Sequence, residues 1–224
     1  MLTTNILFSG ILKIISLLTS LLIVPITINY LNNEVYGIWM TISSMLFWIS
    51  TFDIGLGNGM RNYLTKAISE KDLTLGRKYI STTLSLLSLI AITIGFLLLI
   101  PLFTINFNKF FNTFAISNVD LRNALFVALA FTLLNFVTKN IGLIFVAMQK
   151  YAINDLLSVL GNLLSLAIIF ILTKTTSPNL LYVIFTYTAT QCFVYLFAAI
   201  PLFTKYKELR PSLNYFDRSL SRQI

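Results

Sequence analysis

The sequence has no histidine and a single cysteine, and only 11% of its 224 residues are charged. Histidine is the commonest side-chain ligand of metals, so its absence leads us to expect no metal site. The lone Cys192 excludes a disulfide within the chain. No Gly-x4-Gly-Lys-Ser/Thr loop occurs, so we expect no nucleotide hydrolysis and no cofactor. A soluble domain carries about 25% charged residues, so this composition points away from a water-soluble fold.

Hydrophobic residues make up 57% of the sequence and gather in long runs. A helix needs about 20 apolar residues to cross a hydrocarbon core of roughly 30 Å, and it satisfies its backbone hydrogen bonds internally. The sequence therefore predicts an all-α, polytopic membrane protein, with a six-helix transmembrane lobe over residues 1–204. The predicted spans are 6–31, 36–56, 79–105, 121–147, 155–174 and 180–204.

The basic residues cluster beside the predicted spans. Lysine and arginine number 16 against 8 acidic residues, and two clusters lie within 61–78 and 205–222. With six spans, both clusters share one side of the membrane with the two termini, and the positive-inside rule places that side in the cytoplasm. We expect residues 205–224 to form a basic cytoplasmic segment. Such clusters set the orientation and attract anionic membrane lipid, so we expect no nucleic-acid partner.

Three charged residues lie inside the predicted spans, where a charge costs roughly 2.5–3.5 kcal/mol and usually marks a pathway. They are Lys13, Asp53 and Lys139, and all three fall in the half of the membrane expected to face the cytoplasm. One interpretation is a cavity of net positive charge that attracts an anionic substrate. The other is structural: the lysines extend to the lipid headgroups or pair with Asp53.

Four uncharged amide side chains accompany these charges within the spans: Asn135, Asn140, Asn162 and Gln191. Asn135 and Lys139 are four residues apart and therefore share a helix face. These amides either line a polar cavity or form hydrogen bonds between helices, and the second role is the commoner one in membranes.

Alternating glycines, Gly55, Gly57 and Gly59, lie where the second predicted span ends. A dinucleotide-binding fingerprint needs a strand before such glycines, and here a membrane helix precedes them. We therefore expect the glycines to let the helix end, bend or approach a neighbour closely.

Several short motifs resemble those of Wzx-type polysaccharide flippases. They are PITINYL at 25–31, YGIW at 36–39, FDIGLG at 52–57, the Gln149-Lys150 pair with Asn154, and LRPS at 209–212. These flippases belong to the multidrug/oligosaccharidyl-lipid/polysaccharide exporter superfamily, which includes the multidrug exporters known as MATE. The resemblance covers nearly the whole chain. It implies translocation of undecaprenyl-phosphate-linked oligosaccharide, as in O-antigen or capsule synthesis, across the bacterial plasma membrane by alternating access.

The resemblance also implies roles for the intramembrane charges. Basic residues contact the pyrophosphate or acidic sugars, and by position the candidates are Lys13, Arg61 and Lys139. Asp53 is then their counter-charge or an ion-coupling group. The superfamily cavity lies between two six-helix lobes, so we expect this chain to be one lobe: a truncated piece, a product of a disrupted gene, or a half-transporter with a partner chain.

Two alternative functions stay open at this stage. A drug or small-cation exporter of the same superfamily favours acidic cavity groups, whereas Lys13 and Lys139 outnumber Asp53. A non-transporting scaffold for envelope assembly would bind glycosyltransferases or a polymerase. We expect no enzyme activity, because the few acidic residues are scattered and form no clustered carboxylate motif.

Overall fold

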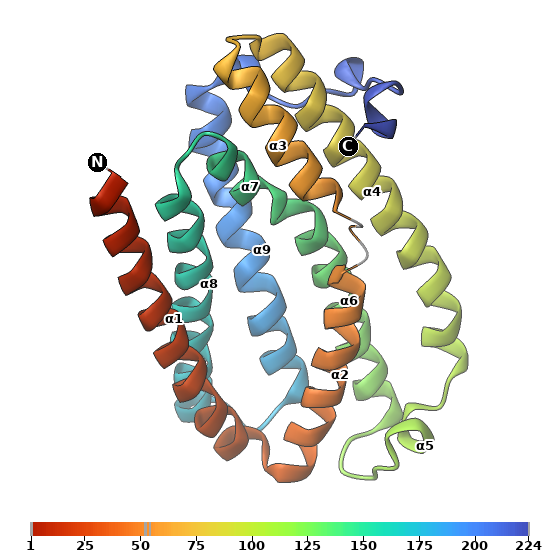
Figure 1. Cartoon of the computed structure of the whole chain (residues 1–224). Coiled ribbons are helices and arrows are strands. Elements are labelled where there is room, and N and C mark those ends of the chain that lie inside the picture. The colour runs from red at the N-terminus through yellow and green to blue at the C-terminus, as the bar shows by residue number, and fades with distance from the viewer. Residues whose placement is uncertain (1, 52, 54, 224) are drawn as a thin grey trace.

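The computed structural model describes residues 2–51, 53 and 55–223, and all regular secondary structure within these ranges is helical (Figure 1). The all-α prediction is thereby confirmed. The helices are α1 (Leu2–Leu31), α2 (Asn33–Thr51), α3 (Leu56–Ser69), α4 (Leu73–Thr104), α5 (Phe107–Phe111), α6 (Asn118–Thr138), α7 (Asn140–Ala147), α8 (Tyr151–Thr175) and α9 (Leu180–Lys205), followed by three short 3-10 helices.

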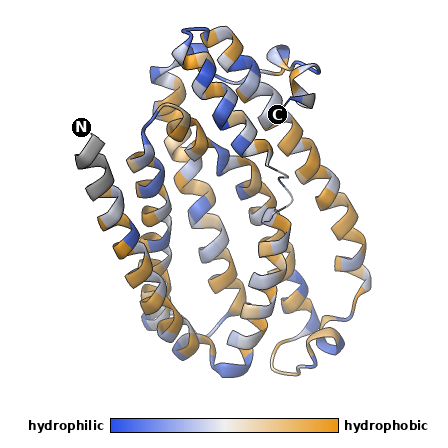
Figure 2. Ribbon diagram, in the orientation of Figure 1, coloured by the Kyte–Doolittle hydropathy of each residue, from blue (hydrophilic) through white to orange (hydrophobic). Residues whose placement is uncertain are grey.

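Among the described residues, five helical segments are long and apolar enough to cross a membrane, and a sixth is obtained if α2 and α3 count as one bent span. The five are Phe8–Leu31, α4, Asn118–Ala147 (α6 and α7 together), α8 and α9. Their outward faces expose large apolar side chains, such as Leu21 at 70% and Phe96 at 68% exposure. Figure 2 shows hydrophobic residues along most of α4 and hydrophilic residues gathered at the ends of the bundle. The multi-pass membrane prediction is confirmed.

The second predicted span differs most from the structure. We expected a helix over 36–56, but α2 ends at Thr51 and a second helix, α3, begins at Leu56 after a bend of 44°. Gly55 lies in this bend with a φ of 84°, a left-handed conformation that glycine adopts without steric cost. The glycines therefore redirect the helix where we expected the span to finish. Phe52 and Ile54 lie outside the described residues.

The helices pack in pairs around α9. Helix α1 packs mainly against α8 and helix α2 against α6, while α9 lies against both α6 and α8. As a result α1 and α2 meet at a turn and diverge from there (Figure 1). Both ends of the described chain lie toward the same end of the bundle, which we call the terminal end. The turns between α1 and α2 and between α8 and α9 lie at the opposite end.

Residues 207–223, which we call the C-terminal strap, cross the terminal end of the bundle and bind α4 (Figure 1). The backbone N–H of Asp217 donates to Thr82 Oγ1 at 3.0 Å, and the Asp217 carboxylate lies 3.2 Å from Lys78 Nζ. Hydrogen bonds from Ser219, together with Lys78, lower the pKa of Asp217 below its ordinary value. The strap is therefore attached to the bundle by specific contacts.

Candidate functional site at a broken helix

The bend between α2 and α3 exposes the carbonyl end of α2. The last four carbonyls of a helix have no partner within it. Lys139 Nζ donates a hydrogen bond of 3.0 Å to the carbonyl oxygen of Ser50, one of these last carbonyls. A cation is favourable at the negative end of the helix dipole. Lys139 thus supplies the charge that this half-helix end requires.

The amino end of α3 faces a carboxylate. Asp53 Oδ1 accepts a hydrogen bond of 2.9 Å from the N–H of Gly55, and the Asp53 carbonyl accepts one of 2.8 Å from the N–H of Leu56. An anion is favourable at this end of a helix. Asp53 Oδ2 also lies 3.8 Å from Lys139 Nζ. Each end of the broken span therefore meets a charge of the opposite sign, and the two charges face one another.

Lys139 itself lies at a second break, between α6 and α7. Asn140 Nδ2 donates to the carbonyls of Phe136 and Val137, at 2.9 and 3.3 Å. Gly57 on α3 packs directly on Asn140: a β-carbon at Gly57 would overlap Asn140 Oδ1 and lie 2.8 Å from Leu143 Cδ1. The two breaks are therefore locked together by a contact that only glycine permits.

Two buried amide oxygens beside the ion pair have no hydrogen-bond partner among the described residues. They are Oδ1 of Asn135, one turn before Lys139, and Oδ1 of Asn140. Leaving a buried acceptor unsatisfied costs about 1–3 kcal/mol. We therefore expect a water or a ligand donor on these oxygens, which makes the site around Lys139 polar as well as charged.

The structure brings together Asp53 and Lys139 but keeps the other predicted charges apart from them. The two side chains are 22% and 30% exposed, so the pair is shielded yet still accessible. Arg61 lies one turn beyond Gly57 on α3 and donates to Asn62 Oδ1 at 3.1 Å. Lys13 is exposed on α1 and forms no ion pair within the described ranges.

The remaining predicted amides link helices. Asn162 Nδ2 donates to Ser16 Oγ at 3.0 Å, and Gln191 Nε2 donates to Asn162 Oδ1 at 2.9 Å. Together they connect α1, α8 and α9, which is the interhelical role that we weighed against a cavity lining. Ser16 is three residues from Lys13, so Lys13 lies within one turn of this polar network.

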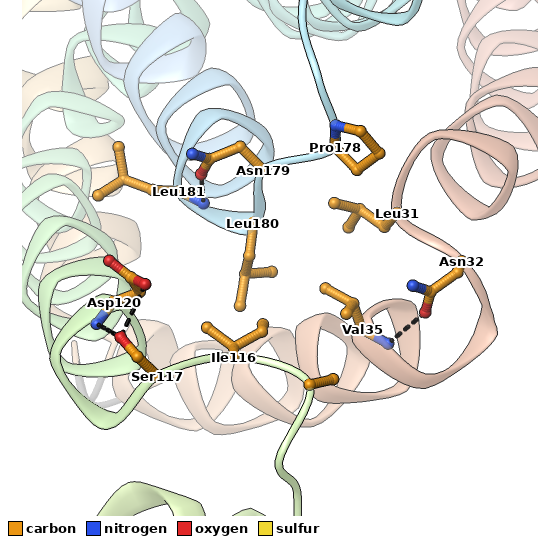
Figure 3. A pocket seen from close by; sticks show the side chains of 11 residues that line it. Leu31, Asn32, Val35, Ile116, Ser117, Asp120, Pro178, Asn179, Leu180 and Leu181 are labelled. Carbon is orange, nitrogen blue, oxygen red and sulfur yellow. Dashed lines mark hydrogen bonds between the residues drawn. The ribbon is translucent and has the colours of Figure 1, made fainter.

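A cavity of about 330 Å³ lies at the opposite end of the bundle. It lies where three connecting segments meet, between α1 and α2, before α6, and before α9. Figure 3 shows that Asn32, Ser117 and Asn179 each accept a backbone N–H at the start of the following helix. These polar groups serve as helix caps, so they are not evidence for a binding site.

The carbonyl of Ser50 and the contact between Gly57 and Asn140 were not foreseen in the sequence. A backbone carbonyl has no sequence signal of its own. The alternating glycines were the available signal for a close approach, but nothing in their spacing identified Asn140 as the neighbour.

Within the described residues, a bundle with five or six candidate membrane spans, one of them broken beside an ion pair, is a polytopic membrane protein. The chain belongs to the polysaccharide biosynthesis protein family, whose model matches residues 2–224. Searches of curated proteins and of solved structures found no match. The family agrees with the resemblance noted in the sequence at the level of polysaccharide biosynthesis.

Proposed function

We propose that this chain moves lipid-linked polysaccharide repeat units across the bacterial plasma membrane by alternating access. Family membership supports a role in polysaccharide export. The observation that carries the transport part is the broken α2–α3 span, whose two ends meet Lys139 and Asp53 at 3.0 and 2.9 Å. Transporters place solute and ion sites at interrupted helices of this kind, because half-helix ends offer unpaired backbone groups and dipole charge.

The charges divide between two tasks in this proposal. Lys139 is already engaged by Ser50 and Asp53, so Lys13 and Arg61 are the cations freest to contact the phosphate or acidic sugars of an undecaprenyl-phosphate-linked substrate. Asp53 is the counter-charge or ion-coupling group. When Asp53 binds a coupling cation, Lys139 loses its counter-charge and becomes available to the substrate anion.

The proposal includes a cytoplasmic location for the terminal end and a second six-span lobe. The orientation is supported by the basic clusters within 61–78 and 205–222. The second lobe, in the same polypeptide or in a partner chain, follows from the MATE-like arrangement that the resemblance implies. Together the lobes would enclose the cavity that one lobe alone leaves open.

A drug or small-cation exporter is the alternative within transport, and an assembly scaffold is the alternative outside it. The structure gives the exporter less support than the sequence did, because Lys139 lies 3.8 Å from Asp53 and offsets its negative charge. A scaffold that binds glycosyltransferases or a polymerase requires no charge within the membrane, so this function would not explain the charged residues at the α2–α3 break.

The test is flipping of a fluorescent lipid-linked oligosaccharide in vesicles that contain the protein, with the charge-removing variants Lys13→Gln and Lys139→Gln. Lys174→Gln is the matched control, because Lys174 is exposed in the last turn of α8, at the end of the bundle opposite the terminal end. We expect both test variants to slow flipping and the control to leave it unchanged. Intact flipping in both test variants would refute the substrate role of these lysines. Absence of flipping in the unaltered protein, with glycosyltransferase binding retained, would favour the scaffold.

A further inference from the structure

A groove runs along the lipid-facing side of α4. One part, of about 490 Å³, lies between α4 and α6 and is almost wholly apolar, with Ala91, Gly95 and Ala130 among its walls. A second part, of about 530 Å³, continues toward the terminal end and passes beneath residues 211–213 of the C-terminal strap. The two parts share Ser88, Ile92 and Val137, so they form one continuous depression.

The length of the groove limits what can fill it. Its walls on α4 extend from Ser81 to Leu99, a distance of about 27 Å at 1.5 Å per helical residue. One leaflet is about half of the roughly 30 Å hydrocarbon core. An acyl chain of an ordinary phospholipid stays in its own leaflet, whereas a single chain that fills the whole groove must pass the bilayer midplane. A polyprenyl chain is long enough to do so.

A fixed cation, Arg77, lies one turn of α4 beyond the groove, toward the terminal end. Arg77 is four residues before Ser81 and therefore lies on the same face of α4. Its Nε donates to the carbonyl of Arg210 at 2.7 Å, and its guanidinium lies 4.0 Å from the centre of the Tyr215 ring. These contacts leave Nη1 and Nη2 without a partner among the residues described. The strap carries Glu208 and Asp217, and Asp217 is paired with Lys78.

We propose that this groove binds the polyprenyl chain of a lipid-linked substrate, with Arg77, one turn beyond the groove, on the first phosphate. This inference rests on the proposed function, because a polyprenyl carrier is the substrate class assigned there. It adds a tail site on the outer face of the lobe, separate from the charges at the broken helix. The sugar would then travel past the α2–α3 break while the tail stays in lipid and groove.

The experiment measures binding to the purified chain in nanodiscs by native mass spectrometry, with undecaprenyl phosphate as the probe. Ala130→Phe fills the outer part of the groove, and Ala167→Phe is the matched control, because both alanines are exposed, Ala167 on α8 away from the groove. We expect Ala130→Phe to weaken binding by about tenfold or more, equivalent to about 1.4 kcal/mol, and the control to leave it unchanged. Farnesyl phosphate, whose chain is too short to reach Ala130, should bind equally to both variants.

A second experiment removes the cation. Arg77→Gln should weaken the binding of undecaprenyl phosphate but not that of undecaprenol, which lacks the phosphate. The proposal would be overturned if Ala130→Phe and Ala167→Phe changed the binding of undecaprenyl phosphate equally. It would also be overturned if Ala130→Phe weakened the binding of phosphatidylglycerol as much as that of undecaprenyl phosphate. If Ala130→Phe fails to fold, a photoreactive residue at Leu134, in the groove, should capture the probe, and one at Leu163 on α8 should not; equal capture at both would overturn the proposal.

These measurements require no transport. Groove binding without flipping would refute the proposed function and leave the tail site standing. Flipping without groove binding would refute the tail site and leave the proposed function standing.

Discussion

Replacement of Gly57 by alanine tests whether the two helix breaks are locked together. The new β-carbon would overlap Asn140 Oδ1, so Asn140 must move and give up its hydrogen bonds to the carbonyls of Phe136 and Val137. Overpacking costs about 1–3 kcal/mol and each lost hydrogen bond about 1 kcal/mol, while alanine regains about 1 kcal/mol of helix propensity. The expected net loss is therefore about 2–4 kcal/mol in the free energy of unfolding.

Gly37→Ala is the matched control for that change. Gly37 lies within α2, and a β-carbon there has nothing within 4 Å. This variant should gain up to about 1 kcal/mol from helix propensity alone. Unfolding of both proteins in mixed micelles, titrated with sodium dodecyl sulfate and followed by circular dichroism, measures the difference. If Gly57→Ala proves as stable as Gly37→Ala, the close contact with Asn140 does not exist as described.

Three further outcomes are expected. Asn162→Leu removes the hydrogen bonds that link α8 to α1 and α9, and at about 0.6 kcal/mol each it should cost about 1 kcal/mol in the same unfolding assay. Tyr30→Phe should cost about 1–2 kcal/mol, because the buried hydroxyl bonds two groups of the α8–α9 loop, and an unchanged midpoint would contradict this. Because Ser219 and Lys78 lower the pKa of Asp217, its contribution to strap docking is present above the unfolded value of 3.8 and is lost as pH falls through the lower folded pKa. Amide-exchange protection of the strap should therefore fall in that acidic range, and a variant Asp217→Asn should not show the dependence.

The membrane spans were predictable because length and hydropathy decide them directly. The expected spans at 121–147, 155–174 and 180–204 match helical segments that end within a few residues of those limits. Each run is long enough to cross the hydrocarbon core, and no alternative packing competes with that requirement.

Helix α3 shows why the second span was misread. Met60, Leu64 and Ala67 are fully or almost fully buried and recur at the spacing of one helix face, while Lys66 is exposed. This pattern indicates an amphipathic helix and was present in the sequence. The preceding glycines, however, were read as the place where the span ends, and the amphipathic stretch was counted only as a cluster of basic residues beside the span.

The charged site was predictable in part. The cost of burying charge singled out Asp53 and Lys139, and their pairing was one of the two interpretations considered. The sequence did not reveal that Lys139 binds the Ser50 carbonyl, because backbone acceptors become available only where a helix breaks. Locating such partners requires the three-dimensional path of the chain.

The divergence of α1 from α2 has a mechanical consequence. Helix α1 is fastened to α8 through Ser16 and Asn162, whereas α2 lies against α6 and is tethered by Lys139. Lys13 and the ion pair at the break thus lie on two different helix pairs, which are connected by the short turn at Asn32 and both pack against α9. A rocking of one helix pair against the other would change the spacing of these charges while every contact within each helix pair stays intact. Such a movement would alter the electrostatic field of the bundle without unfolding any helix.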